Sequence, residues 1–345
     1  MTGKPALAGL KIEELKVLLS NYPALRSRQI HEWICRGAKT FGEMTNLSLS
    51  LREELSENFS LFSGKICSEL KSRDGTVKLG IELEDGAVIE AVILSDGKDR
   101  KTACLSSQAG CPAACVFCKT GLLGFKRNLT AQEITSQFLL LKNRESEISH
   151  IVIMGMGEPF FNMDELRKAL FFIMDPSGLN ISKRRITLST SGITKGIYGL
   201  INEGPELRLA FSLITARQEL RDRLMPISRE NPLPRIKEAL LKYQEKNERR
   251  LTLEMVLFAG LNTCQTEAKA ASEFAGSLNV VFNLIPWNEV PGLEFEGRPL
   301  KRPDKQEVTS FAAALESYGQ KVTQRIEKGR SISGACGQLG VLDRL

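Results

Sequence analysis

The sequence lacks the long apolar runs that would place it in or across a membrane. Of its 345 residues, 42% are hydrophobic and 26% are charged. No apolar stretch of about eighteen residues, the length that spans a bilayer, is free of charge. The N-terminus, Met1-Thr2-Gly3-Lys4, leads into a polar helical pattern and not into the apolar segment of a signal peptide. We therefore expect a cytoplasmic globular protein without a membrane contact and with a large core.

Histidine is scarce, because the chain has only His31 and His150 and neither belongs to a metal-binding or triad pattern. A histidine-rich metal centre and a catalytic site with a histidine base are both disfavoured. Cysteine, in contrast, occurs eight times. In a chain expected to stay in a reducing compartment, these thiols favour a metal or catalytic centre over a disulfide framework.

Neither sign of charge dominates, since 47 Lys and Arg residues face 41 Asp and Glu residues and leave a net charge of +6. This modest excess is compatible with a polyanionic partner such as RNA. Basic residues that could contact RNA fall into three groups: Arg26, Arg28, Arg36 and Lys39; Lys126 and Arg127; and Lys183, Arg184 and Arg185. Each group also fits an ordinary solvated surface.

The first third of the chain changes from helical to strand-like patterning. Apolar residues recur at helical spacing over 12–20 and 26–35. From about 65 to 94, short strand-like runs alternate, and Asp-Gly pairs at 74–75 and 85–86 indicate hairpin turns. We expect an N-terminal helical accessory domain (1–62), a short β-meander connector (63–96) and a core domain (97–345).

The core domain shows repeated β-α units. Strand-like runs follow Thr102 and recur at 151–154, 185–189, 207–213, 251–257 and 280–285. Helical patterns lie near 131–143, 164–174, 233–246, 265–276 and 304–318. Such alternation predicts an α/β fold with a parallel sheet, either open or closed into a barrel.

The most informative segment is Cys111-Pro-Ala-Ala-Cys115-Val-Phe-Cys118, which follows a predicted strand and precedes a helix. A turn that leads into a helix start can direct three thiolates at one soft metal centre. A four-iron cubane with three protein ligands leaves one iron open for chemistry. A structural zinc site completed by a remote cysteine, or three unrelated thiols, are the alternative interpretations.

With this motif, the sequence resembles the radical S-adenosylmethionine enzymes. The resemblance implies a partial (β/α)6 barrel in which Cys111, Cys115 and Cys118 hold a 4Fe-4S cluster, and the open iron binds S-adenosylmethionine. The segment Met154-Gly-Met-Gly157-Glu158-Pro159 resembles the glycine-rich segment of that superfamily. Gly157 and Glu158 are then expected to contact the methionine moiety of the cofactor, although Gly-Glu-Pro alone also fits an ordinary turn.

Further segments resemble the RlmN/Cfr family of RNA adenosine methyltransferases, and its RlmN branch in particular. They are Gln29-Ile-His-Glu-Trp33, Arg184-Arg-Ile-Thr-Leu-Ser189-Thr-Ser-Gly192, Leu220-Arg-Asp-Arg-Leu-Met-Pro226-Ile, Asn283-Leu-Ile-Pro-Trp-Asn288 and Gly334-Ala-Cys336-Gly-Gln-Leu339. The resemblance spans nearly the whole chain. It implies methylation of adenosine carbon 2 in 23S rRNA and in tRNA, an RNA-binding role for the accessory domain, a flavodoxin- or ferredoxin-type electron donor, and a monomer.

The family's chemistry assigns roles to three further side chains. Carbon 2 of adenine is electrophilic, so direct methyl transfer from a sulfonium does not work there. By resemblance, Cys336 is methylated to S-methylcysteine by one S-adenosylmethionine, and a second one generates the radical that activates this methyl group. Cys104 is then the resolving thiol, which forms a transient disulfide with Cys336 and releases the product. Glu90 matches the proton acceptor if the chain carries one extra residue around 95–99; a solvent-facing strand residue is the alternative.

Cofactor-binding positions are also implied by the resemblance: Ser189, Ser212, Leu213, Ile214 and Asn288. Two departures from the family pattern bear on the substrate. Ile214 stands where the family usually has histidine, and Arg330-Ser331-Ile-Ser333 replaces a pair of acidic residues before Cys336. Methylation at carbon 8, as in the Cfr branch, or of a different RNA therefore stays open. A zinc-stabilised, non-catalytic RNA-binding protein is the alternative from another class.

Overall fold

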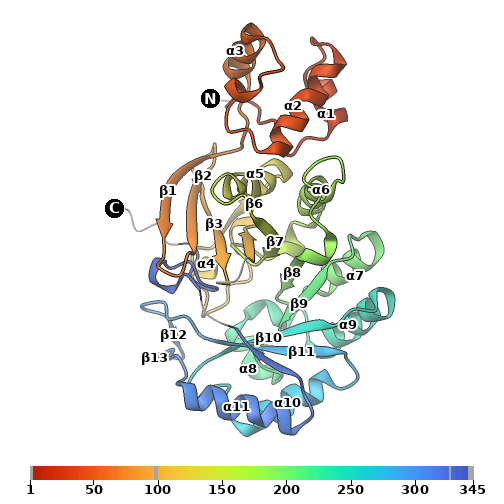
Figure 1. Ribbon diagram of the computed structural model, residues 1–345. Helices are drawn as coiled ribbons and strands as arrows, with labels where there is room; N and C mark the ends of the chain where they lie inside the picture. Colours follow the sequence, from red (N-terminus) through yellow and green to blue (C-terminus); the bar gives the residue numbers. More distant parts are fainter. Residues whose placement is uncertain (1–2, 97–99, 326–327, 341–345) are drawn as a thin grey trace.

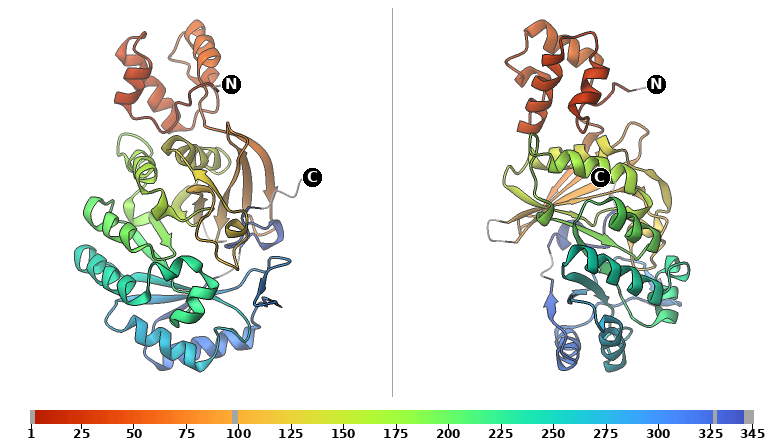
Figure 2. Two further views of the ribbon diagram at one scale, coloured as in Figure 1. Left: turned by 180° about the vertical axis from the view of Figure 1, so that it is seen from behind. Right: turned by 90° about the vertical axis from the view of Figure 1, so that its right-hand side faces the viewer.

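The computed structural model describes residues 3–96, 100–325 and 328–340. An N-terminal helical head comes first (Figures 1 and 2) and contains α1 (Ile12–Leu18), α2 (Ala24–Arg36), the short η1 (Phe41–Glu43) and α3 (Leu49–Asn58). Helix α2 ends at Gly37, whose φ of 92° lies in the left-handed region that favours glycine. The Ser48 side chain caps α3 by accepting from the backbone N–H of Leu51. The two helical segments expected at 12–20 and 26–35 are thus present with shifted ends.

Three antiparallel strands follow the head: β1 (Lys65–Lys71), β2 (Val77–Glu82) and β3 (Val88–Ser95). Their turns fall at the two Asp-Gly pairs, as the sequence predicts. The meander does not form a sheet of its own. Strand β3 pairs antiparallel with β4 (Lys101–Leu105), so a single sheet runs in the order β1-β2-β3-β4-β7-β8-β9-β10-β11-β14. Gly97, Lys98 and Asp99, where one extra residue is expected, lie outside the described residues.

In this sheet, the strands from β4 onwards are parallel to one another, as the β-α repeats predict. After β4 come β7 (Ile148–Ile153), β8 (Ile186–Thr190), β9 (Arg208–Ser212), β10 (Leu251–Leu257), β11 (Val280–Pro286) and the short β14 (Val322–Gln324). Helices cover the outside of this curved sheet (Figure 2): α5 (Ala131–Lys142), α6 (Met163–Met174), α7 (Thr194–Glu203), α9 (Leu233–Asn247), α10 (Gln265–Ala275) and α11 (Lys305–Ser317). The fold is an open α/β barrel with an added N-terminal domain, as the resemblance to the radical S-adenosylmethionine enzymes implies.

The remaining elements are small and, except for η3 just before β8, lie beyond the carboxyl ends of the barrel strands. They are β5 (Gln108–Gly110), α4 (Lys119–Leu122), β6 (Phe125–Asn128), α8 (Gln218–Leu224), β12 (Glu294–Phe295), β13 (Arg298–Pro299) and the 3-10 turns η2 (Pro159–Phe161), η3 (Lys183–Arg185), η4 (Pro226–Arg229) and η5 (Arg330–Ile332). None of the helices in the described ranges has the length and apolar character that crossing a bilayer requires.

Candidate active site at the carboxyl ends of the barrel strands

The three clustered cysteines lie in the loop between β5 and β6. The backbone N–H of Cys111 donates to the carbonyl of Gly124 at 3.0 Å, which closes the base of the loop. Gly110 is required at this closure, because its φ is 78° and a Cβ there would lie 1.8 Å from the Gly124 oxygen. Cys118 is the N-cap residue of α4. Local backbone geometry therefore holds the thiols together at one end of the barrel.

Cys111, Cys115 and Cys118 line a cavity of about 170 Å³ together with residues from the carboxyl ends of β7, β8, β9, β10 and β11. Burial raises the pKa of all three thiols, to about 12 for Cys111, and repulsion between them raises that of Cys115 further. Three buried thiolates therefore need a cationic partner. This donor set fits an iron–sulfur cluster, whose thiolates attach to separate irons. No three histidine, cysteine or acidic side chains of the described residues converge closely enough for a single metal ion.

Polar atoms without a protein partner also face this cavity. The Oδ1 atom of Asn288 and the Oγ atom of Ser191 are buried and have no hydrogen-bond partner among the described residues. Ser189 donates to a Glu254 carboxylate oxygen at 2.9 Å and lies 3.4 Å from the Ser212 hydroxyl. Buried polar groups are normally satisfied, so the free atoms suit a polar ligand such as S-adenosylmethionine.

Contacts with neighbouring residues fix the conformation of the Gly157-Glu158 segment. Gly157 has a φ of 102°, and a Cβ there would meet the Gln108 side chain at 2.6 Å. Glu158 accepts hydrogen bonds from the backbone N–H of Ser191 at 2.7 Å and from the Thr190 hydroxyl at 2.8 Å. Burial raises its pKa even though these bonds oppose the shift. Because an ionised carboxylate offers about four acceptor sites, Glu158 can still receive a ligand N–H.

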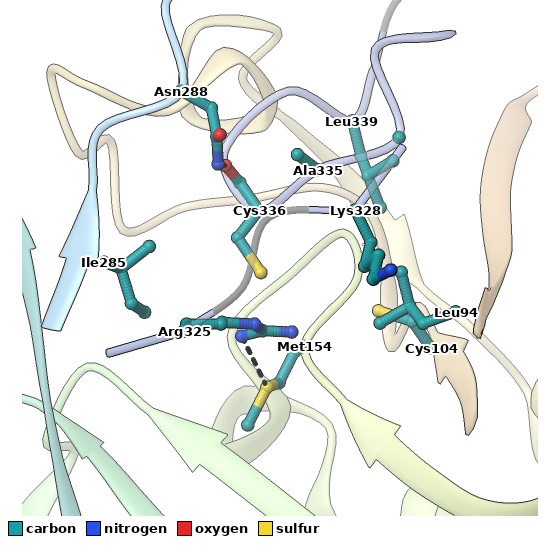
Figure 3. A pocket seen from close by; sticks show the side chains of 11 residues that line it. Leu94, Cys104, Met154, Ile285, Asn288, Arg325, Lys328, Ala335, Cys336 and Leu339 are labelled. Carbon is teal, nitrogen blue, oxygen red and sulfur yellow. Dashed lines mark hydrogen bonds between the residues drawn. The ribbon is translucent and has the colours of Figure 1, made fainter. Parts of the chain in front are cut away.

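Cys336 is held at the rim of the same cavity by its own backbone. Its carbonyl accepts from the Asn288 side chain at 3.1 Å, and the next carbonyl, of Gly337, accepts from the backbone N–H of Lys119 at 2.9 Å. The sulfur points into the barrel, towards Arg325 and Met154 (Figure 3). A small cavity of about 40 Å³ is lined by both Cys336 and Cys104. The structure thus brings these two cysteines to one cavity from opposite ends of the core domain.

Arg325 is the charged group between the two thiols, and the sequence interpretation did not single it out. Its Nη1 atom lies 3.9 Å from the Met154 sulfur and 3.9 Å from a Glu254 oxygen. Cys336, Glu254 and Cys104 raise the pKa of Arg325, with Cys336 the largest cause. Burial raises the pKa of Cys104 to about 12, repulsion from Cys336 adds to this, and Arg325 opposes it. A lone Glu254 in the apolar β10 was the signal that could have indicated this polar interior.

Arg221 of α8 is a second functional candidate that sequence reasoning missed. It is fully buried, and its guanidinium donates to the carbonyls of Ser191 at 2.6 Å, Ser212 at 2.8 Å and Leu213. Burial lowers its pKa to about 10. The guanidinium therefore ties the ends of β8 and β9 together behind the cavity.

Glu90 lines neither cavity, but its hydrogen-bond partner Gly340 follows Leu339, which lines the small cavity of Cys104 and Cys336. Strand register places Val92 opposite Cys104, and alternation puts Glu90 on the same face of the sheet as Val92. The Glu90 carboxylate is buried, lies 2.8 Å from the Lys78 ammonium and accepts from the backbone N–H of Gly340 at 2.5 Å. It is therefore not the solvent-facing strand residue of the alternative interpretation.

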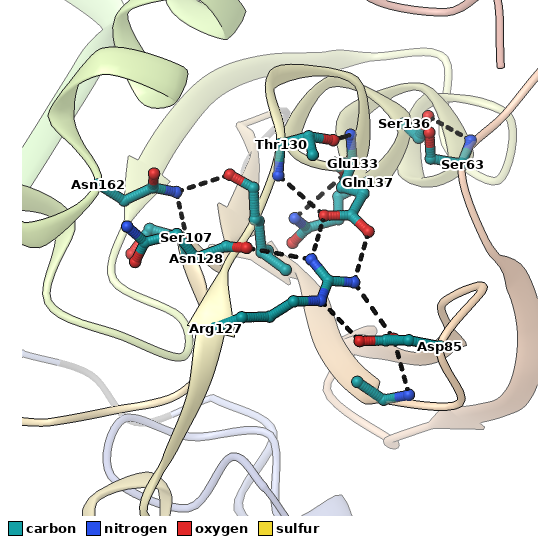
Figure 4. A network of polar contacts seen from close by, with 12 residues as sticks. Ser63, Asp85, Ser107, Arg127, Asn128, Thr130, Glu133, Ser136, Gln137 and Asn162 are labelled. Atoms are coloured by element: carbon teal, nitrogen blue, oxygen red, sulfur yellow. Dashed lines mark hydrogen bonds and ion pairs between the residues drawn. The ribbon is translucent and has the colours of Figure 1, made fainter. Parts of the chain in front are cut away.

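A polar network supports the β5–β6 hairpin that carries the cysteine loop (Figure 4). Arg127 of β6 contacts Asp85 in the meander turn at 2.6 Å and Glu133 of α5 at 2.8 Å. The Asn162 side chain donates to the carbonyls of Ser107 at 2.7 Å and Leu129 at 2.8 Å. Arg127, one of the basic residues considered for RNA contact, thus joins the meander to the core.

Most of the predicted site residues meet at one place. Those that line the cavity of the clustered cysteines are Cys111, Cys115, Cys118, Gly157, Glu158, Ser189, Ser212, Ile214, Asn288 and Cys336. Leu213 is buried and is not among the lining residues; its backbone carbonyl is held by Arg221. Ile214 adopts a positive φ of 61°.

Comparison with known proteins gives consistent matches. The family model described as "Radical SAM superfamily" matches residues 105–270, and "Ribosomal RNA large subunit methyltransferase N-terminal domain" matches residues 6–61. The chain is 49% identical to the "Probable dual-specificity RNA methyltransferase RlmN" of Treponema denticola, over 98% of this chain and 96% of that protein. The protein of the same name from Geobacillus kaustophilus is 39% identical over 99% of this chain and 93% of its own length.

A solved structure shares the whole fold. The crystal structure of a radical SAM methyltransferase from Sphaerobacter thermophilus matches with a TM-score of 0.92 at 35% sequence identity, over 97% of this chain and 99% of that one. The match therefore extends from the helical head to the C-terminal segment.

Proposed function

Because the chain belongs to the RlmN family of radical SAM RNA methyltransferases, we propose that it methylates carbon 2 of adenosine in 23S rRNA and in tRNA. The observation that carries the proposal is the position of Cys336. Its sulfur lies at the edge of the cavity of the three clustered cysteines and shares a second cavity with Cys104. A methyl acceptor must reach the cofactor on one side and the resolving thiol on the other, and this position offers both.

The proposed cofactors are a 4Fe-4S cluster held by Cys111, Cys115 and Cys118, and two molecules of S-adenosylmethionine per turnover. When bound, they supply the methyl group and the 5′-deoxyadenosyl radical. A flavodoxin- or ferredoxin-type protein is the proposed electron donor. An enzyme that acts on rRNA and tRNA is expected in the cytoplasm, and we expect it to act as a monomer.

The side chains around the cavity bind and orient the cofactor. Glu158 is proposed to accept from the methionine amino group, and Asn288, with its free Oδ1 atom, to bind the nucleoside part. Ser189 and Ser212 lie at adjacent strand ends. Leu213 and Ile214 are proposed to act through their backbone, because an isoleucine side chain offers no hydrogen bond.

Cys336 and Cys104 are proposed to carry the covalent steps. The Cys336 thiolate would take a methyl group from S-adenosylmethionine by displacement, with S-adenosylhomocysteine as the leaving group. The S-methyl group would then give a hydrogen atom to the 5′-deoxyadenosyl radical, and the resulting methylene radical would add to the adenine carbon. Glu90 is proposed to take the proton from that ring carbon, and the surplus electron of the adduct would pass to the cluster. The Cys104 thiolate then attacks the Cys336 sulfur and breaks its bond to the new methyl carbon, which takes up a proton, and a Cys104–Cys336 disulfide remains.

Mass spectrometry of nucleosides tests the function directly. We expect expression in a methylation-deficient host to add 2-methyladenosine to both the rRNA and the tRNA pools. The Cys336→Ser variant should add none, whereas Cys264→Ser, at an exposed cysteine outside both cavities, should behave as wild type. Gain of 8-methyladenosine would show the other ring carbon as the target. Gain of neither nucleoside by a protein with an intact cluster would contradict the proposal.

A further inference from the structure

The barrel holds a larger cavity on the other side of Arg325. Its volume is about 460 Å³, whereas the cavity between Cys104 and Cys336 has about 40 Å³. Pockets for small molecules measure several hundred cubic ångströms, so only the larger space is the size of a nucleoside site. Met154 and Arg325 line both of these cavities and also the cavity of the clustered cysteines. The larger space, here called the lower cavity, therefore adjoins the small cavity that both thiols line.

The wall of the lower cavity combines apolar residues, such as Leu94, Val152 and Ala210, with several polar side chains. Side chains from five strands line it: Thr102, Thr187, Thr252, Asn283 and Gln324. Barrel interiors are normally filled by branched apolar residues, so hydroxyl and amide groups at these positions are unusual. Such groups can pair with the edges of a base that has left its helix.

The C-terminal segment, residues 328–340, covers the barrel at the carboxyl ends of the strands. The Thr120 hydroxyl donates to the carbonyl of Leu339 at 2.7 Å, and Lys119 donates to Gly337 at 2.9 Å. These bonds fix the segment to the cysteine loop. A large substrate cannot approach Cys336 from this end while the segment is in place.

The same segment also crosses the gap between β14 and the meander. The backbone N–H of Gly329 donates to Asp74 at 2.9 Å, and the Ser331 hydroxyl lies 2.9 Å from that of Ser72. Asp96 and Arg100, which come just before β4, line the lower cavity, so this cavity reaches the amino ends of the parallel strands.

Exposed cations surround this amino-terminal edge. Five of them precede or begin neighbouring strands: Arg100 before β4, Arg185 before β8, Arg208 in β9, Arg250 before β10 and Lys321 before β14. We call these five residues the basic rim. Their side chains make no hydrogen bond or ion pair with other parts of the chain that the structure describes.

Acidic residues at this edge do not balance the basic rim. Glu206 is paired with Lys183 at 2.7 Å, and Glu145 lies 3.6 Å from Lys101. Three further carboxylates lie at this edge: Glu147, Glu248 and, at the cavity itself, Asp96. The five cations of the basic rim therefore outnumber them. His150 lies among them: burial lowers its pKa, and Arg100, Arg185 and Arg208 lower it further. Several unpaired cations on one edge suit a phosphate backbone.

We propose that RNA docks its backbone on the basic rim and that the target base enters the barrel there, through the lower cavity, to reach Cys336. This inference rests on the proposed function and adds the direction from which the substrate arrives. An enzyme that modifies a base carbon must take the base out of its stack. The lower cavity gives the extruded base a space that is separated from the small cavity of the two thiols by the shared residues Met154 and Arg325.

Charge reversal tests the docking surface. We expect Arg185→Glu with Arg208→Glu to weaken binding of an in vitro transcribed tRNA by about 10- to 100-fold and to flatten its salt dependence. The control pair, Lys301→Glu with Lys305→Glu, changes the net charge equally beyond the carboxyl end of β11 and should change affinity less than about twofold. Fluorescence anisotropy at several KCl concentrations measures both. Unchanged binding by the rim pair, or equal loss in both pairs, overturns docking on the rim.

Filling the lower cavity tests the route. Thr252→Phe on β10 and Thr187→Phe on β8 should keep S-methylation of Cys336, read by peptide mass spectrometry, and should keep RNA binding. RNA methylation should fall by about 100-fold, because the base can no longer reach the position from which its ring carbon reacts. The control Thr309→Phe adds the same ring at an exposed threonine of α11, outside the three cavities, and should keep wild-type RNA methylation. Wild-type RNA methylation in both folded Phe variants, or loss of Cys336 methylation in both, overturns the route.

The wild-type protein separates this inference from the proposed function. If the function is wrong, wild type forms neither S-methyl-Cys336 nor methylated adenosine, whatever the variants do. If only the inference is wrong, wild type is active and the rim and cavity variants match their controls. An inactive wild type that still binds RNA through the basic rim would support the docking surface and overturn the route.

Discussion

At Cys104, burial opposes the chemistry that the proposed mechanism requires. The side chain is 5% exposed, and burial raises its thiol pKa to about 12, helped by Cys336 and opposed by Arg325. A thiolate, and not a thiol, attacks a sulfur bond. At neutral pH, Cys104 is therefore held almost entirely in its unreactive protonated form, which protects the free enzyme from premature disulfide formation.

We expect release of RNA from the covalent adduct to speed up as the pH rises. Since the Cys104 pKa lies above the assay range, the thiolate fraction grows about tenfold per pH unit between roughly 7 and 9. The rate of loss of the crosslinked species in single-turnover reactions, followed on denaturing gels, measures this step. A release rate that stays flat over this interval would mean that deprotonation of Cys104 does not limit it.

Replacing the same residue separates the resolving role from a packing role. Cys104→Ala should accumulate a crosslinked protein–RNA species, because nothing attacks the Cys336 sulfur. Loss of one buried sulfur costs about 1 kcal/mol of stability, so the variant should remain folded. Cys35→Ala, at a buried cysteine in the head, is the control and should give no crosslink. Free methylated RNA at the wild-type rate from Cys104→Ala would refute the resolving assignment.

Among the elements, α8 shows how a short helix can organise distant strand ends. The helix has seven residues, too few to be stable alone, and it holds Arg221 against three backbone carbonyls: one just after β8, one at the end of β9 and one in the turn after β9. The guanidinium also lies 4.9 Å over the Phe211 ring. Because those carbonyls belong to residues around the cofactor cavity, the packing of α8 sets the geometry of the site.

We therefore expect Arg221→Met to lower the free energy of unfolding by about 2–4 kcal/mol, since several buried carbonyls lose their donor. It should also weaken binding of S-adenosylmethionine. Arg223→Met, on the same helix, removes a half-exposed ion pair with Glu296 and a contact with the Phe295 ring, and should cost about 1 kcal/mol. Urea denaturation measures stability, and calorimetric titration measures binding. Equal stability of the two variants would contradict the clamping role of Arg221.

Elements with strong periodicity were predictable from the sequence, and elements held by distant contacts were not. Strand β10 has the predicted limits, and α5, α9 and α10 begin at the predicted residues. The sequence interpretation did not assign α7 or α8. Helix α7 contains Gly196 and Gly199, which weaken its local helix signal, and α8 is short and polar.

The residues of the candidate active site also divide into those that local sequence patterns predict and those that only the folded chain brings together. The cysteine motif and the Gly-Glu segment are local patterns, so their positions could be read from spacing and resemblance. Arg325 could not be read in this way, because it follows the short β14 and meets Cys336 only in the folded chain; the one local signal of this polar interior was the lone Glu254 in the apolar β10. The lower cavity likewise arises from one residue on each of several strands, and no single segment carries its pattern.

At the scale of the whole molecule, the apolar core does not stop at the boundary between head and barrel. One cluster of buried residues extends from Leu7 and Ile34 in the head to Phe172 and the barrel strands. The His31 ring packs edge-on against Phe172 with centroids 5.4 Å apart. A continuous core couples the two parts, so the head is expected to hold a fixed position relative to the barrel when RNA binds.

The two tryptophans of the chain allow this coupling to be tested. Trp33 lies in the head, where its Nε1 donates to Asn46, and Trp287 is buried near the cysteine loop, where its Nε1 donates to Phe117. Trp287→Phe leaves a reporter of the head, and Trp33→Phe leaves a reporter of the barrel. Because both parts share one core, we expect urea unfolding of the two apoproteins to give fluorescence midpoints that agree with circular dichroism of the same samples. A head reporter that unfolds at clearly lower urea than the circular dichroism signal would instead mean that the accessory domain is an independent unit and that its position on the barrel is set by RNA.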